Sequence, residues 1–202
     1  MKLFLVGFPK SGTSTIHEAL QCSGLRSAHW KCAEGFVGEI IYDNFYRGRP
    51  PFASLEAYDA ITQADVCLPE EGINLWPNLD FSILAWIRQA HPDCLFLLNW
   101  RDPASVASSI SRWGDLQNRL AACDIPGLPR GYGIRTTHLI RWIEGHYEAV
   151  RVLFKDSNFL ELDIAAPDAA EKLGGALGVP LAWWGRANVN SPEAQEPPGE
   201  VA

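Results

Sequence analysis

Two glycines separated by four residues constrain the fold of this chain more than any other feature. Gly7 and Gly12 belong to the segment Gly-Phe-Pro-Lys-Ser-Gly-Thr-Ser at positions 7–14. The apolar run Leu3–Val6 predicts a buried strand at residues 2–6 before this segment, and residues 13–22 predict a helix after it. A strand, a glycine-containing turn and a helix in this order present backbone N–H groups at a helix N-terminus, where such groups bind phosphate. We therefore expect an α/β protein that begins with a phosphate-binding loop.

The rest of the chain alternates predicted strands with predicted helices. The apolar run CLFLLNW at residues 94–100 is the clearest strand, because a parallel strand buried on both faces is apolar throughout. Shorter strands are predicted at residues 25–30, 58–66 and 159–162. Helices are predicted at residues 78–90, from Pro103 to about residue 121, around 140–154 and at 168–177. This alternation predicts a three-layer α/β sandwich with a mainly parallel sheet.

The length and the distribution of loop-forming residues indicate a single domain. A chain of 202 residues suits one hydrophobic core. We expect that domain to cover residues 1–190, and the proline- and glutamate-rich residues 191–202 to be a disordered tail. Residues 31–57 are predicted to form a loop with some helix, of the kind that serves as a substrate lid, and residues 123–133 to form a second loop.

Composition excludes several classes of protein. The net charge of -7 disfavours nonspecific nucleic-acid binding. No run of 18 apolar residues is present, so no transmembrane segment is expected, and the short N-terminal apolar run predicts a strand rather than a signal peptide. The five cysteines include no C-x-x-C pair, which argues against a zinc site or a disulfide framework and favours a cytoplasmic location. The sequence leaves the oligomeric state open.

The lysine of the glycine-containing segment is displaced from the position that a nucleoside triphosphatase uses. Gly7 and Gly12 keep the Walker A spacing, but Thr13 follows the second glycine where a triphosphatase has lysine. Lys10 lies two residues before Gly12 instead. From there it would neutralise charge on the 5′ side of a bound donor as a phosphate leaves, without the serine or threonine and Mg²⁺ of a Walker site.

The segment FLVGFPKSGTSTIHEAL resembles the 5′-phosphosulfate loop of sulfotransferases that use 3′-phosphoadenosine 5′-phosphosulfate (PAPS), whose signature is P-K-[SA]-G-T before a helix. The resemblance implies a fold like that of P-loop NTPases. It implies transfer of a sulfuryl group from PAPS to a hydroxyl or amine of a small-molecule, sugar or lipid acceptor, with 3′-phosphoadenosine 5′-phosphate (PAP) as product and no metal. The residues implied to bind the donor are Pro9, Lys10, Ser11, Gly12, Thr13 and Ser14.

A second motif of the same family binds the 3′-phosphate of the donor with an arginine at a strand end and a serine eight residues later. Arg101 and Ser109 have this spacing, and the intervening Asp102-Pro103 matches the family's R-[DN]-P. Ser108 is an adjacent alternative. The last third of the chain resembles the bacterial branch of the family at HYEAVR, LELDI and LGVP. The R-K-G-x-x-G segment of eukaryotic members has no counterpart, and Arg186 or Lys172 would take over its basic role.

Transfer to a hydroxyl needs a base, for which the sequence offers two main candidates. His29 is at the end of the predicted second strand, and Asp65 is at the end of the third. His17 and Glu18, on the helix after the loop, are further alternatives. The other histidines are interpreted as structural or solvated: His91, His138 and His146. Trp30 and Trp76 are candidates to line an apolar acceptor pocket, although packing in the core is the preferred interpretation of each.

Two other functions are compatible with these motifs. The first is a kinase or another P-loop phosphotransferase, which would use ATP with Mg²⁺ and take Asp102 as its acidic residue; Thr13 after Gly12 argues against it. The second is a noncatalytic nucleotide-binding protein on the same fold, since a fold does not guarantee activity.

Overall fold

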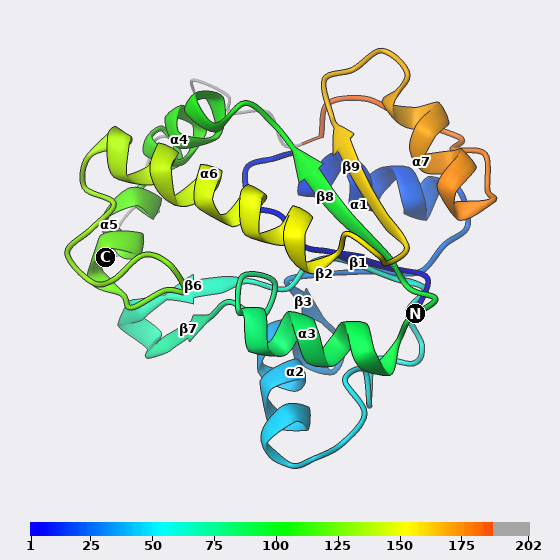
Figure 1. Ribbon diagram of the computed structural model, residues 1–202, viewed down its shortest axis with the longest axis horizontal. Helices are drawn as coiled ribbons and strands as arrows, with labels where there is room; N and C mark the ends of the chain where they lie inside the picture. The colour runs from blue at the N-terminus through cyan, green and yellow to red at the C-terminus, as the bar shows by residue number, and fades with distance from the viewer. Residues whose placement is uncertain (188–202) are drawn as a thin grey trace, which may run out of the picture.

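The computed structural model describes residues 1–187 as a twisted sheet with helices on both faces (Figure 1). The elements in chain order are β1 (Leu3–Leu5), α1 (Thr13–Cys22), β2 (Ser27–His29), β3 (Lys31–Cys32), β4 (Gly35–Phe36), α2 (Val37–Tyr46), β5 (Ala60–Gln63), β6 (Val66–Leu68), the short 3-10 helix η1 (Pro69–Glu71), β7 (Ile73–Leu75), α3 (Phe81–Ala90), β8 (Leu95–Trp100), α4 (Pro103–Ser111), α5 (Leu116–Ala122), α6 (Thr136–Leu153), β9 (Phe159–Asp163) and α7 (Ala169–Leu177).

The main sheet has the strand order β4-β3-β2-β5-β1-β8-β9. The strands β2, β5, β1, β8 and β9 pair in parallel, whereas β3, at one edge, pairs antiparallel with both β2 and β4. Leu3 of β1 pairs with Leu95 of β8 on one side and Ala60 of β5 on the other. The predicted α/β sandwich with a mainly parallel sheet is therefore confirmed. The carboxyl ends of the parallel strands share one edge, where ligands bind in sheets of this type.

Alternate residues of the central strands pack against different helices. Phe4 and Val6 face a core that includes residues of α2, α3, α4 and α6. Leu3 and Leu5 face a smaller core formed with α1 and α7. In Figure 1, α6 lies in front of the sheet, and α7 lies at the right, beside β9 and near α1. Helices on both faces explain why β8 is almost entirely apolar and buried.

Several segments differ from their predicted form. The single helix predicted from Pro103 to about residue 121 is wrong, because the chain turns between α4 and α5 and Gly114 has a positive φ of 49° there. The strand predicted at residues 58–66 ends at Gln63, and residues 66–75 form the β6–β7 hairpin, which the sequence did not predict. Residues 31–57 contain the expected helix, α2, together with an edge hairpin, β3–β4. The lid role of this segment stays a prediction.

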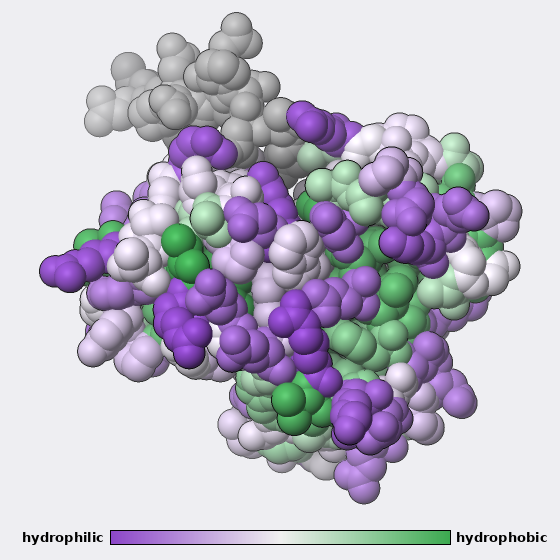
Figure 2. Space-filling view, turned by 45° about the horizontal axis from the view of Figure 1, so that its top comes forward, coloured by the Kyte–Doolittle hydropathy of each residue, from purple (hydrophilic) through white to green (hydrophobic). Residues whose placement is uncertain are grey.

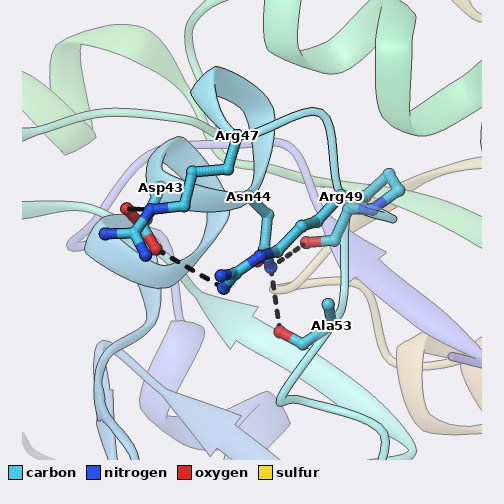
Figure 3. A network of polar contacts seen from close by, with 6 residues as sticks. Asp43, Asn44, Arg47, Arg49 and Ala53 are labelled. Carbon is cyan, nitrogen blue, oxygen red and sulfur yellow. Dashed lines mark hydrogen bonds and ion pairs between the residues drawn. The ribbon is translucent and has the colours of Figure 1, made fainter.

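Polar contacts fix the chain after α2 (Figure 3). Asp43 forms an ion pair with Arg47 at 2.6 Å and approaches Arg49 at 3.9 Å. The buried Asn44 amide donates to the carbonyl oxygens of Pro51, at 3.2 Å, and Ala53, at 2.8 Å. Asn44 thus satisfies two carbonyl groups of the segment that follows α2. Hydrogen bonds from a buried side chain therefore hold this segment, in addition to the surface ion pairs of Asp43.

The surface of the protein carries hydrophilic and hydrophobic residues side by side (Figure 2). No helix within residues 1–187 is long and apolar enough to cross a bilayer. Figure 2 shows hydrophilic and hydrophobic residues interspersed over most of one face. The most exposed large hydrophobic residues of the described part of the chain are Tyr46 on α2, Val152 on α6, and Tyr132 and Ile134 in the loop between α5 and α6. The predicted domain end at residue 190 and the predicted disordered tail at residues 191–202 lie outside the described residues.

Candidate functional site

The buried side chain of Asn99 binds the loop between β1 and α1 through two hydrogen bonds. Its Nδ2 donates to the carbonyl oxygen of Phe8 at 3.2 Å and to that of Ser11 at 2.9 Å. Gly7 lies against the same amide, and a Cβ atom at this position would overlap Asn99 Oδ1. Gly7 is thus required by close packing, whereas Gly12, with φ of 81°, is required by the backbone conformation at the start of α1.

Two more side chains bind carbonyl groups of the same loop. The Nδ2 of Asn78 donates to the carbonyl oxygen of Gly7 at 2.9 Å. The Nη1 of Arg101 donates to the carbonyl oxygen of Lys10 at 2.9 Å. With Asn99, these donors satisfy the carbonyls of residues 7, 8, 10 and 11. The loop is therefore fixed by side chains from β8 and its following turn and from the segment before α3.

The N–H groups at the end of the loop have no such partners. Within residues 1–187, the backbone N–H groups of Ser11, Gly12, Thr13 and Ser14 donate to no acceptor. Gly12 caps α1 without a side-chain hydrogen bond, and the first turn of that helix contains no acidic residue. Consecutive N–H groups of this kind, together with the positive end of the helix dipole, attract an anion such as a phosphate.

Lys10 has a backbone conformation that few non-glycine residues adopt. Its φ is 64°, which costs of order 1–3 kcal/mol and is found most often at functional sites. Its Nζ lies 3.0 Å from the centre of the Trp113 ring, in the turn between α4 and α5. Burial, and then the nearby charge of Arg101, lower the pKa of Lys10 to about 8. The ammonium is thus charged at neutral pH but only partly solvated.

The guanidinium of Arg101 lies beside the loop. One of its five donors is used by Lys10, and its own carbonyl oxygen accepts a hydrogen bond from the Tyr147 hydroxyl at 3.3 Å. Ser109 lies buried on α4, and Ser108 is half-buried on the same helix. No hydrogen bond joins Arg101 and Ser109, both of which the structure describes, so their joint role in binding a 3′-phosphate stays a prediction.

Asp65 is a buried carboxyl group connected to both ends of the loop. Its oxygens accept hydrogen bonds from Gln63 Nε2, at 3.0 Å, and from Asn78 Nδ2, at 3.2 Å. Gln63 Oε1 in turn accepts from the Thr13 hydroxyl at 3.2 Å, and Asn78 also binds Gly7. Burial raises the pKa of Asp65 to about 7. Its place in this network favours a role in holding the loop over contact with an acceptor.

His29 is the more accessible of the two predicted bases. It ends β2, at the edge of the sheet where the loop also lies, and it is half-buried. Its Nδ1 lies 3.2 Å from the Thr62 hydroxyl oxygen, and its ring stacks on that of His17 with 4.9 Å between centroids. Burial, and then the neighbouring His17, lower the pKa of His29 to about 4, so the imidazole is neutral at pH 7.

His146, Trp76 and Trp30 lie in different surroundings. His146 is buried, and its Nε2 lies 2.7 Å from the carbonyl oxygen of Val6, just before the loop. Trp76 is buried in the larger core and its Nε1 donates to Asn74 Oδ1 at 2.7 Å. Trp30 is 41% exposed, with a positive φ of 42°, beside the β3–β4 hairpin.

Sequence reasoning missed three residues of the site: Asn78, Asn99 and Trp113. The signal for Asn99 was present, since a lone polar residue in the apolar strand LFLLNW needs a buried partner. Trp113 was hidden by the assumption of one continuous helix. A shallow hollow of about 490 Å³ lies elsewhere, along the end of α7 between Gly174 and Leu181, and none of the candidate residues borders it.

Comparison with known proteins adds no assignment. No protein-family model matches this sequence, and a search of curated proteins finds no match. The function is therefore argued from the loop and the residues around it.

Proposed function

We propose that this protein is a sulfotransferase that transfers a sulfuryl group from PAPS to a hydroxyl of a small-molecule, sugar or lipid acceptor. One observation carries the proposal. The loop has its carbonyl groups bound by Asn78, Asn99 and Arg101, while the N–H groups of its last residues have no partner within residues 1–187. This arrangement is complementary to a phosphate group, and the displaced lysine that resembles the sulfotransferase motif lies in the same loop.

The residues present are suitable for the donor. The N–H groups of residues 11–14 would hold its 5′-phosphate at the start of α1. Lys10 would face the bridging oxygen between phosphorus and sulfur, and Arg101 would hold the 3′-phosphate together with Ser109 or Ser108. The bound donor supplies the electrophilic sulfur. Thr13 contributes through its backbone, since its hydroxyl already donates to Gln63.

The chain's own residues account for the proton and the charge in the reaction. His29, neutral at pH 7, accepts the proton of the acceptor hydroxyl as the acceptor oxygen bonds to sulfur. The bond between sulfur and the bridging oxygen breaks, and the electron pair stays with the departing PAP. Lys10 stabilises the negative charge that develops on that oxygen. We favour His29 over Asp65 because Asp65 is buried and bound to two amides.

The structure also bears on the phosphotransferase alternative. Such an enzyme uses a lysine after the second glycine and the following hydroxyl as a Mg²⁺ ligand. Here Thr13 occupies the lysine position, and its hydroxyl donates to Gln63. The proposal needs no metal ion, and it retains the cytoplasmic location predicted from the cysteines.

A thermal-shift experiment tests the proposal. PAP, with a chelator present, should raise the Tm because it binds only the folded chain. AMP, which lacks the 3′-phosphate, should raise the Tm less at the same concentration. Activity should then appear as PAP release from PAPS with phenols, sugars or lipid alcohols as acceptors. A shift with ATP and Mg²⁺ but none with millimolar PAP would reject the sulfotransferase in favour of the phosphotransferase.

A further inference from the structure

Two buried hydroxyl groups, of Thr62 and Ser27, connect the two stacked histidines, His29 and His17, in a hydrogen-bond network. His29 Nδ1 lies 3.2 Å from Thr62 Oγ1, Thr62 Oγ1 lies 3.1 Å from Ser27 Oγ, and Ser27 Oγ lies 3.0 Å from His17 Nδ1. Thr62 and Ser27 are buried on neighbouring strands, and both histidines are half-buried. Distances alone leave the direction of these hydrogen bonds undefined, because hydroxyls and imidazoles both donate and accept.

The carbonyl group of Ala28 determines which atoms of this network donate and which accept. Thr62 Oγ1 also lies 3.1 Å from the carbonyl oxygen of Ala28, which only accepts. A threonine hydroxyl has one proton, so Thr62 donates to Ala28 and accepts from its other two neighbours. His29 must therefore donate from Nδ1. In a neutral imidazole, a proton on Nδ1 leaves Nε2 unprotonated with its lone pair available.

The same reasoning applies to the other hydrogen bonds of this network. Thr62 has no further proton, so Ser27 donates to Thr62. Ser27 then has only its lone pairs for His17, and His17 also donates from Nδ1. Any other assignment opposes two lone pairs at one of these contacts or leaves the buried Ala28 carbonyl without the Thr62 donor. The network is consistent with one proton arrangement, which gives both histidines the same tautomer.

We propose that Thr62 is a positioning residue whose hydroxyl fixes His29 in the Nδ1–H tautomer and so keeps Nε2 as the proton acceptor. This inference rests on the proposed function for the role of His29 as base, but the tautomer itself is independent of any activity. A base must have a lone pair on the nitrogen that meets the substrate, and a partner on the other nitrogen supplies it. Thr62 suits this task because its β-branched side chain is stiff and wholly buried on β5.

Two substitutions at position 62 separate the hydroxyl from the shape of the side chain. Thr62→Val keeps the branched shape and removes the hydroxyl, whereas Thr62→Ser keeps the hydroxyl. Ser27→Ala provides a matched control, because it breaks the connection to His17 and leaves the bond between Thr62 and His29. Circular dichroism and thermal melting would check that each variant folds.

The tautomer is measured directly by long-range ¹H–¹⁵N NMR of the full chain at pH 7, where His29 is neutral. His29→Gln identifies its signals. We expect His29 to be the Nδ1–H tautomer in the wild type, in Thr62→Ser and in Ser27→Ala, and a mixture of both tautomers in Thr62→Val. A wild-type His29 protonated on Nε2, or an unchanged tautomer in Thr62→Val, would overturn the proposal. The wild-type spectrum alone decides the first point, even if Thr62→Val does not fold.

Kinetics provide the second measurement. With an acceptor that the wild type sulfates, Thr62→Val should lower kcat by about tenfold or more, because part of the protein then holds the proton on the wrong nitrogen. PAP affinity should stay unchanged, and Thr62→Ser should recover most of kcat. Wild-type kcat in a Thr62→Val protein that shows mixed tautomers would overturn the positioning role. If the wild type sulfates no acceptor and does not bind PAP, the proposed function fails, while the NMR result still decides whether Thr62 controls the tautomer.

Discussion

The ammonium group of Lys10 lies over the indole ring of Trp113, with 3.0 Å between Nζ and the ring centre. Lys10 comes from the loop after β1, and Trp113 from the turn between α4 and α5, more than 100 residues later in the chain. The indole face attracts the cation and shields it from water on one side. Because the strained backbone of Lys10 is fixed by Arg101, this contact defines where the ammonium lies before a ligand binds.

Lys10→Ala should reduce turnover more than donor binding. A cation at the bridging oxygen stabilises the transition state, whereas the N–H groups of residues 11–14 still hold the 5′-phosphate. We expect kcat for PAP release from PAPS to fall by about a hundredfold or more, with a smaller change in the Kd of PAP. Lys155→Ala, which removes an exposed lysine of equal charge, is the control and should leave both unchanged.

The pH dependence of turnover gives the same lysine a second test. The pKa of Lys10 is lowered to about 8, so its charge is lost as pH rises through that value. The wild-type rate should therefore decline between about pH 7 and 9. In Lys10→Arg the guanidinium stays charged, so the decline should disappear although the rate itself is lower. A decline of the same size in Lys10→Arg would assign it to another group.

Arg101→Ala should weaken the binding of PAP more than that of adenosine 5′-phosphosulfate. Both ligands depend on the loop that Arg101 supports through the Lys10 carbonyl, so both lose affinity. Only PAP has a 3′-phosphate, and loss of a charge-assisted bond to it adds a further decrease of roughly tenfold. Arg112→Ala, at the exposed end of α4, is the control for net charge. Isothermal titration calorimetry measures both affinities, and equal losses would make Arg101 a support for the loop alone.

The sequence predicted the parts of the fold that depend on local pattern. Residues 3–5 and 95–100 are buried strands, and the helix at residues 13–22 begins directly after Gly12, as expected. These elements are specified by continuous apolar runs or by a glycine at a helix start. The α4–α5 turn was missed because the apolar periodicity continues across it, and Gly114 was not recognised as a break.

The sequence predicted the loop of the site but not the side chains that bind its carbonyl groups. Residues 7–14 could be identified from spacing, but the side chains that hold them come from distant positions. Asn99, for example, binds residues 88 and 91 positions away. Such contacts depend on how β8 pairs with β1, which no local pattern specifies. For the same reason the sequence offered both His29 and Asp65 as strand-end candidates, with His29 preferred, and it could not show how their burial and partners differ.

Gly7→Ala should destabilise the protein through its contact with Asn99. The added methyl group would overlap the Asn99 amide and displace it from the loop carbonyls, at a cost of about 1–3 kcal/mol. In an Asn99→Ala background the space is open, so Gly7→Ala should cost much less, and urea unfolding of the four proteins measures the coupling. Gly175→Ala, where an added Cβ meets nothing, should instead stabilise α7 by about 0.5–1 kcal/mol. Additive effects at positions 7 and 99 would show that the methyl is accommodated elsewhere.

The buried Asp65 should make part of the stability depend on pH in an unusual direction. Burial raises its pKa from the ordinary value of 3.8 to about 7. Between these values the folded chain holds a proton on Asp65 that the unfolded chain has lost, so this group's contribution to stability falls as pH rises from about 4 to about 7. The buried His146 acts in the opposite direction, because burial lowers its pKa to about 4 and the unfolded chain binds its proton first.

A comparison with Asp65→Asn separates these opposing effects, because the variant keeps His146 and has no group that ionises at position 65. The unfolding free energy of the variant should rise more steeply with pH between about 4 and 7 than that of the wild type. The two slopes should differ by at most about 1.4 kcal/mol per pH unit, the value for one proton. Urea unfolding at pH 4.5, 5.5 and 6.5 provides the measurement, and each variant is compared with itself across pH, so a constant loss from the changed hydrogen bonds cancels. Parallel curves would mean that Asp65 ionises near its ordinary pKa in the folded chain. In that case the hydrogen bonds from Gln63 and Asn78 would outweigh the effect of burial, and a charged Asp65 would hold the two ends of the loop.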